Sequence, residues 1–344
     1  MKTELYDLVR VNSFEGWYAG EDARLLAAMD GPLMRGATAI RIMGWATLAG
    51  LGLMLLGAAA LVIGLVEAGT LNRMAAESLA SLLVGLALGS LGGLIFLVGL
   101  VGYVLIPAFQ WELAKRDYGS HRTILASLAL AVVVSNLVSV PYFLIQGMPD
   151  ASLRPRDLLF GITALELVLG LIVYLRVVRP GVITWAQMGL TTEHLGRRVL
   201  IGLASGLGLF LLAAVTGLLM SRLGIEQTQS QQFASIQGAP PLQFGLMLLL
   251  GGLLTGFCEE SFFRGFAFQA YADSKGLGQA YLFSSFLFAS VHLDWRAFVP
   301  ILVLGFSLAF IYRRSGSLIP SALAHAVNNM LSFCILYFGP PLGG

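Results

Sequence analysis

Three segments near the carboxyl end of the chain place ionisable or amide side chains inside long apolar sequence. The first segment is Glu259-Glu260-Ser261-Phe262-Phe263-Arg264. In the second, His292 follows Phe288 by four residues, and in the third Asn329 follows His325 by four. An ionisable side chain at mid-membrane costs at least ~2.5–3.5 kcal/mol, so it is normally paired or functional. Carboxylates and imidazoles in such places bind zinc or pass protons and ions, and the residues alone leave these chemistries open.

Helical spacing predicts how these side chains group. Glu260 and Arg264 are four residues apart, so they share a helix face and can form an ion pair. Glu259 is rotated by about 100° from Glu260 and is free to point elsewhere. His325 and Asn329 also share a face. At 1.5 Å per residue, the polar side chains of all three segments lie about 12–20 Å from the expected cytoplasmic ends of their spans. One shared polar site within the membrane is therefore expected.

The chain that must position these residues is much more apolar than a soluble protein. Of its 344 residues, 57% are hydrophobic and 12% are charged, which is about half the charge of a soluble domain. Apolar blocks of spanning character cover residues 42–66, 79–106, 124–146, 158–178, 199–221, 243–271, 279–293, 297–312 and 317–338. The seventh and eighth blocks are short and are separated only by Asp294-Trp295-Arg296. We therefore expect an all-α, polytopic transmembrane helical bundle with eight or nine spans.

The distribution of charge predicts an orientation and limits the partners. Fifteen of the 21 Lys and Arg residues fall in one set of alternate loops and five in the other. Because cytoplasmic loops carry the excess of positive charge, the N-terminus is expected in the cytoplasm of an integral multi-pass membrane protein, in the plasma membrane if the source is prokaryotic. The formal net charge of +2 is too small to indicate a nucleic-acid partner. The lipid bilayer is the partner that the composition requires.

Two further features concern helix packing. Gly202 and Gly206, and likewise Gly252 and Gly256, are four residues apart, a spacing that lets helices approach closely in lipid. Glu166 lies in the fourth apolar block without an obvious local partner. We interpret it as a packing contact or a protonated carboxyl group rather than as a catalytic residue.

Taken in order, the three polar segments resemble the motifs of a known family. Glu259-Glu260-x-x-x-Arg264, Phe288-x-x-x-His292 and His325-x-x-x-Asn329 are similar to those of the CAAX protease and bacteriocin-processing (CPBP) family. Its members are intramembrane glutamic endopeptidases similar to the CAAX prenyl endopeptidase. Met188-Gly189-Leu190 and Ser315-Gly316-Ser317-Leu318 resemble the segments that flank the family's helices.

The resemblance covers about residues 188–338 and divides the chain. It predicts a cytoplasmic tail over residues 1–37, four N-terminal transmembrane helices over 38–187 that lie outside the resemblance, and a protease-like core over 188–344. The substrate that it implies is a peptide or protein reached within the membrane. A prenylated C-terminal peptide, a leader peptide and a membrane-protein segment all remain open.

The resemblance also implies a role for each matching residue. Glu259 is expected to be the general base, and with His292 it would hold and polarise the attacking water. His325 and Asn329 would donate hydrogen bonds to the oxyanion that forms on the peptide carbonyl group. No metal or other cofactor is implied.

The supporting residues of this interpretation lie beside the catalytic ones. The Glu260–Arg264 ion pair would orient its helix and balance its charge. The aromatic rings of Phe263 and Phe288 are candidates for lining a substrate groove, although ordinary packing would equally place them there.

Two other functions are compatible with the same residues. Glu259, His292 and His325 are of the types that bind zinc, so a zinc-dependent intramembrane protease is one alternative, although the chain lacks a His-Glu-x-x-His segment. A non-enzymatic membrane transporter, immunity or scaffold protein is the other, because intramembrane carboxylates and histidines also build ion pathways or tie helices together.

Overall fold

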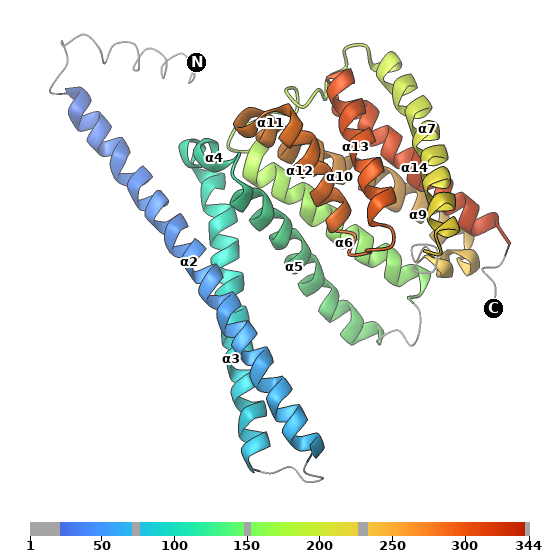
Figure 1. Ribbon diagram of the computed structural model, residues 1–344. Helices are drawn as coiled ribbons and strands as arrows, with labels where there is room; N and C mark the ends of the chain where they lie inside the picture. Colours follow the sequence, from blue (N-terminus) through green and yellow to red (C-terminus); the bar gives the residue numbers. More distant parts are fainter. Residues whose placement is uncertain (1–20, 71–75, 148–152, 226–232, 341–344) are drawn as a thin grey trace. The chain divides into compact units, whose positions relative to one another are not determined.

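The computed structural model describes residues 21–70, 76–147, 153–225 and 233–340, and every regular element in these ranges is a helix (Figure 1). The chain forms two compact units, Met1–Ile106 and Pro107–Gly344. The all-α class expected from the sequence is thereby confirmed for the described residues.

Eight described helical segments are long and apolar enough to cross a membrane. They are Arg35–Glu67, Leu79–Phe109, His121–Gln146, Pro155–Val178, Leu195–Arg222, Pro241–Lys275, Phe298–Ser315 and Leu318–Phe338. The seventh expected block, 279–293, is helix α12 (Leu277–Ser290), which has 14 residues. At 1.5 Å per residue that helix is about 21 Å long and cannot cross a hydrocarbon core of about 30 Å upright. Of the two predicted counts, the structure supports eight, and the chain is an integral multi-pass membrane protein.

The first unit is built from two long helices, α2 (Glu21–Thr70) and α3 (Ala76–Leu105), which pack against each other in antiparallel directions (Figure 1). Glycines buried at seven-residue spacing form the contact, namely Gly50, Gly57 and Gly64 on α2 and Gly85, Gly92 and Gly99 on α3. A Cβ atom on Gly57 would lie only 2.5 Å from the backbone nitrogen of Gly89. The two backbones therefore touch where these helices meet, as small residues allow in lipid.

The second unit begins with a short 3₁₀ turn, η1 (Ile106–Phe109), and α4 (Trp111–Asp117), followed by α5 (His121–Gln146) and α6 (Pro155–Val173). The side chain of Ser120 accepts a hydrogen bond from the backbone nitrogen of Thr123 and so caps α5. Asp157 likewise accepts from the backbone nitrogen of Arg154 at the start of α6. A π-helical turn, η2 (Tyr174–Val178), completes the span that α6 begins.

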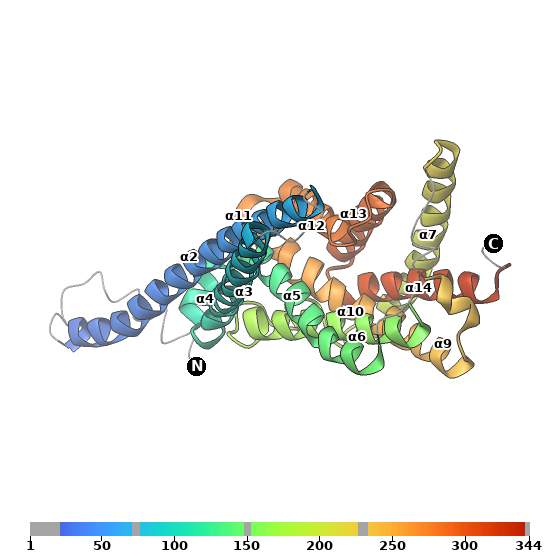
Figure 2. The same ribbon diagram turned by 90° about the horizontal axis from the view of Figure 1, so that it is seen from below.

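The remaining helices surround the polar segments. They are α7 (Leu195–Arg222), η3 (Ala234–Gly238), α9 (Pro241–Met247), η4 (Leu248–Leu254), α10 (Thr255–Glu260), η5 (Ser261–Phe268), α11 (Gln269–Lys275), α12, α13 (Phe298–Ser315) and α14 (Leu318–Phe338). The run from α9 to α11 is one continuous span in which η4 and η5 are π-helical. Helix α14 packs against α7, α10 and α13 (Figure 1, Figure 2).

The two glycine pairs singled out in the sequence both pack against α14. A Cβ atom on Gly206 of α7 would lie 2.5 Å from Val327 Cβ, and one on Gly256 of α10 would lie 2.6 Å from the carbonyl oxygen of Ala322. The predicted close approach of helices at these positions is confirmed. It brings the helix that bears His325 against the helix that bears the two glutamates.

Candidate active site

Glu259 and Glu260 end a six-residue α-helical segment, α10, that lies between two π-helical segments. A π-helix inserts an extra residue into a helical turn, and such turns are rare and are frequent at functional sites. Here they re-aim the side chains before and after the two glutamates relative to a regular α-helix. The sequence predicts regular helical spacing throughout this span, and nothing in the apolar pattern indicates the change.

The ion pair expected between Glu260 and Arg264 is present and fully buried. Arg264 Nη1 lies 2.7 Å from Glu260 Oε1, and both side chains have 0% exposure. Arg264 Nη2 donates a second hydrogen bond to the carbonyl oxygen of Gly305, at 2.9 Å, and the guanidinium lies 4.5 Å from the ring centroid of Phe288. Because a buried ion pair stabilises only when further hydrogen bonds satisfy it, these contacts fix η5 against α12 and α13.

His325 on α14 faces both glutamates. Its Nδ1 atom lies 3.3 Å from Glu260 Oε1, and its Nε2 atom lies 3.8 Å from Glu259 Oε2. Glu259 Oε2 is buried without a hydrogen-bond partner. The imidazole is thus placed beside two carboxylates that differ in kind, since Glu260 is already paired with Arg264 and Glu259 is not part of that pair.

His292 stands where α12 ends. Its Nδ1 atom lies 2.7 Å from the carbonyl oxygen of Phe288, and because a carbonyl group only accepts, Nδ1 is the donor. In the neutral ring this leaves the Nε2 lone pair free to accept a hydrogen bond. The residue that follows, Leu293, has a φ of 51° and turns the chain away from the helix.

A cavity of about 70 Å³ joins the second and third polar segments. It is lined by Leu209, Phe288, His292, Ile301, Leu304, Leu308, His325, Asn328 and Asn329. Asn329 Nδ2 donates to the carbonyl oxygen of Gly251 at 3.2 Å, and Asn328 Nδ2 donates to Asn329 Oδ1 at 3.2 Å. Since an amide nitrogen carries two hydrogens, Asn329 keeps one for a further acceptor. The cavity has room for water and has the polar partners that water needs.

The structure therefore brings together most of the residues that the sequence selected. Phe288, His292, His325 and Asn329 share the cavity, and Glu259 is linked to them through His325. Phe263 is 1% exposed and packs edge-on against Phe288, outside the residues that line the cavity. Asn328 is the polar lining residue that was given no role, although its position three residues after His325 places it on nearly the same face.

The two flanking segments noted in the sequence hold α14 in place. Ser317 Oγ donates to the carbonyl oxygen of Gly189 at 2.6 Å, and the backbone nitrogen of Leu318 donates to the carbonyl oxygen of Met188 at 2.9 Å. Gly189 has a φ of +81°, and a Cβ atom there would lie 2.4 Å from Ser317 Cα. Only glycine meets both demands, so this contact fixes the start of the helix that carries His325 and Asn329.

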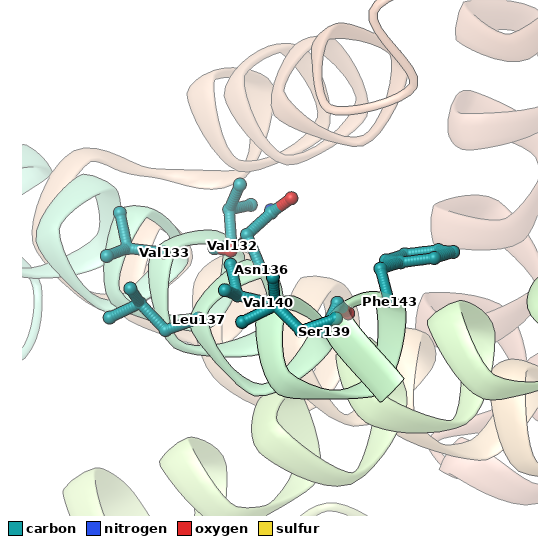
Figure 3. Close-up of a pocket in the computed structure, with 8 residues that line it drawn as sticks. Val132, Val133, Asn136, Leu137, Ser139, Val140 and Phe143 are labelled. Carbon is teal, nitrogen blue, oxygen red and sulfur yellow. Dashed lines mark hydrogen bonds between the residues drawn. The ribbon is translucent and has the colours of Figure 1, made fainter. Parts of the chain in front are cut away.

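A larger hollow of about 540 Å³ lies along α5 and lacks comparable chemistry (Figure 3). None of the eight described residues that line it is ionisable. Its Asn136 donates to the carbonyl oxygen of Val132 and its Ser139 to that of Ser135, so both polar side chains bond to their own helix. The small cavity beside His325, not this hollow, is the candidate site. In the part of the chain that the structure describes, no three His, Cys, Asp or Glu side chains are arranged so that they could hold a metal ion.

Fold and site together define the class of protein: a helical, multi-pass membrane protein that holds a carboxylate, two imidazoles and an amide at one partly buried site. Residues 241–331, which contain all three polar motifs, match the model of the family described as "Type II CAAX prenyl endopeptidase Rce1-like". The resemblance stated from the motifs is confirmed for this part of the chain.

Two curated relatives match shorter stretches. The "UPF0177 protein YxdF" of Lactococcus lactis subsp. lactis (strain IL1403) is 32% identical over 80 residues, which is 23% of this chain and 44% of the relative. The "Putative membrane peptidase YdiL" of Bacillus subtilis (strain 168) is 28% identical over 107 residues, 31% of this chain and 42% of the relative. The chain thus spans less than half the length of the curated relatives it matches, and no solved structure matches it.

Proposed function

We propose that this protein is an intramembrane endopeptidase that hydrolyses peptide bonds with a water molecule activated by Glu259 and His292. The observation that carries the proposal is the position of His325, beside both glutamates and on the wall of the cavity that His292 and Asn329 also line. The family match over residues 241–331 supports the same conclusion, because that stretch contains each of these residues.

In the proposed reaction, the Glu259 carboxylate takes a proton from water while the water oxygen bonds to the peptide carbonyl carbon. His292 Nε2 accepts a hydrogen bond from the same water and orients it. Proton transfer by a positioned side chain contributes about 10²–10⁴-fold to a rate. The carbon–nitrogen bond then breaks, and the proton held by Glu259 passes to the leaving amine.

The oxyanion of the intermediate needs hydrogen-bond donors that are already in place. The unused Nδ2 hydrogen of Asn329 and a ring N–H of His325 would supply them. The carbonyl oxygen of Gly251 accepts the other hydrogen of the Asn329 amide, and Nδ1 of His325 lies 3.3 Å from Glu260 Oε1. Donors that are fixed before the reaction stabilise the developing charge without reorganisation. We propose that this chemistry needs no metal or other cofactor.

The size of the cavity bears on the substrate. About 70 Å³ admits water but not a peptide segment. Besides Phe288 of α12, the apolar part of the wall comes from Leu209 of α7 and from Ile301, Leu304 and Leu308 of α13. We infer that a substrate enters from the bilayer when α7 and α13 separate. The substrate class is a peptide or protein segment that reaches the site within the membrane, with a prenylated peptide included; nucleic acid is not a partner.

The test uses purified protein in proteoliposomes, offered a prenylated CAAX peptide and an unmodified transmembrane peptide, with products identified by mass spectrometry. Cleavage of either peptide is expected. The metal-free mechanism is supported if cleavage persists in an excess of a strong chelator and elemental analysis finds no stoichiometric metal. Loss of cleavage in chelator with recovery on added zinc would replace it with the zinc-dependent one. Proton-coupled uptake without cleavage would instead indicate a transporter.

A further inference from the structure

The backbone fixes the orientation of two neighbouring amide side chains at the cavity. The carbonyl oxygen of Gly251, in the π-helical segment η4, can only accept, so the atom of Asn329 that lies 3.2 Å from it is the donor Nδ2. The other end of that amide, Asn329 Oδ1, accepts a hydrogen bond of 3.2 Å from Asn328 Nδ2. Each bond settles the direction of the next, and Asn328 Oδ1 is the free end of this chain of amides.

The free end is an acceptor that lacks a donor. Asn328 lines the cavity beside His325, and its Oδ1 atom is buried without a hydrogen-bond partner among the described residues. A buried acceptor without a donor destabilises a fold, so proteins keep few of them. His292 Nδ1 already donates to Phe288, and in the proposed reaction the attacking water gives its two hydrogens to Glu259 and His292. The missing donor is therefore expected to arrive with the substrate.

An extended peptide carries a suitable donor beside the carbonyl group that is attacked. In a β-strand, the N–H and C=O groups of one residue point to the same side, which lets that residue exchange two hydrogen bonds with a single partner. The spare Nδ2 hydrogen of Asn329 and the Oδ1 atom of Asn328 form a donor and an acceptor on adjacent residues. A helical peptide does not fit this pair, because its N–H groups are already bonded to carbonyl groups four residues back.

We propose that Asn328 Oδ1 accepts the backbone N–H of the substrate residue whose carbonyl group is attacked, so that the substrate binds as an extended strand. This inference rests on the proposed peptidase function, in which Asn329 binds the oxygen of that same carbonyl group. It narrows the substrate class to segments that are extended or unwound at the cleavage site. Because the contact is the same before and during the reaction, it lowers KM, and the influence of Asn328 on kcat is limited to holding Asn329.

Peptide binding without cleavage tests the contact. The probe is a fluorescent prenylated CAAX peptide, added to Glu259→Gln protein in proteoliposomes, and in a series of analogues one backbone N–H at a time is replaced by an ester oxygen, which cannot donate. One ester should weaken binding by about two- to tenfold, the range of a neutral hydrogen bond. Adding Asn328→Ala should weaken binding of the unmodified peptide by a similar factor, and the same ester should then cause no further loss. Asn136→Ala is the matched control, because that amide bonds to its own helix α5, and every ester should keep its effect there.

The position of the ester separates this inference from the proposed function. The ester that is coupled to Asn328 should lie at the residue just before the bond that the wild-type protein cleaves, and coupling at another residue would overturn the assignment. No measurable binding, no sensitive ester, or losses that multiply in Asn328→Ala at every position would overturn it as well. If the wild-type protein binds the peptide but cleaves none, the proposed function fails, and the ester series still decides whether Asn328 holds a backbone N–H.

Discussion

The two compact units are built from similarly apolar helices, but the kinds of residue that they bury differ. In the described part of Met1–Ile106, the buried positions are glycines together with Leu100 and Val104, so backbone meets backbone. In Pro107–Gly344, the buried positions include Glu166, Glu260 and Arg264, each at 2% exposure or less. Lipid offers no hydrophobic driving force between helices, so close packing and hydrogen bonds must supply it. The first unit shows close glycine packing, whereas the second combines such packing with buried hydrogen bonds and an ion pair.

This difference indicates where chemistry resides. A glycine contact has no group that can exchange a proton, and its whole effect is on helix association. The buried charges of the second unit need partners, and those partners place imidazoles and amides at fixed distances from carboxylates. We therefore expect substitutions in the second unit to change catalysis and substitutions in the first to change packing alone.

The largest effect is expected at the proposed base. Glu259→Gln keeps the size of the side chain but cannot take a proton from water, so kcat for peptide cleavage should fall by about 10²–10⁴-fold. The rate is measured in proteoliposomes, with Glu193→Gln at an exposed loop position as the matched control. A Glu259→Gln protein with the activity of the control would remove Glu259 from the mechanism.

The next effect concerns the buried ion pair. Glu260→Ala leaves the Arg264 charge buried without its carboxylate, which should lower the free energy of unfolding by about 3–5 kcal/mol. Denaturation in mixed micelles with increasing sodium dodecyl sulfate would measure this loss. The double variant Glu260→Leu/Arg264→Met removes both charges and should be more stable than Glu260→Ala. If the double variant is less stable than Glu260→Ala, the unpaired Arg264 charge is not what makes the single substitution costly.

Much of this second unit could be predicted from the sequence, because its signals are local. Apolar length located the spans, and a spacing of four residues predicted both the Glu260–Arg264 pair and the shared face of His325 and Asn329. The spacing of Gly206 and Gly256 likewise predicted close helix contacts. These features depend on residues within one or two turns of a helix.

What could not be predicted depends on contacts between distant segments or on the backbone. The π-helical turns on either side of Glu259 leave no trace in an apolar pattern, since any apolar residue can occupy them. The burial of Glu166 depends on how α6 packs against other helices such as α10, which spacing within one helix does not reveal. The seven-residue glycine repeat of α2 and α3 is visible in the sequence, but the contact that it makes was not predicted.

A smaller effect is expected at the proposed oxyanion donor. Asn329→Ala removes the amide hydrogen that faces the intermediate, so kcat should fall by about 10²–10³-fold with KM nearly unchanged. Asn328→Ala is the neighbouring comparison: its amide donates to Asn329 Oδ1, so its removal should only loosen Asn329 and lower kcat by about tenfold. Steady-state measurements of kcat and KM for both variants would show which of the two amides is the oxyanion donor. A larger loss in Asn328→Ala would transfer the donor role to Asn328.

The smallest effect tests the first unit with two adjacent glycines. A Cβ atom on Gly92 would lie 2.6 Å from the backbone nitrogen of Met54, whereas one on Gly93 would meet nothing within 4 Å. Gly92→Ala should therefore destabilise the α2–α3 pair by about 1–3 kcal/mol, as overpacking does, and Gly93→Ala should change it by less than about 0.5 kcal/mol. Energy transfer between labels on α2 and α3 during denaturation measures the difference.

The same pair of variants can break the comparison between the units. If the first unit only packs, Gly92→Ala and Gly93→Ala should cleave peptide with the same kcat under conditions where both are folded. A loss of activity in Gly92→Ala at full α2–α3 association would mean that the chemistry depends on the geometry of the glycine contact. In that case the buried charges of the second unit would not be sufficient for catalysis, and helices α2 and α3 would also be required for activity.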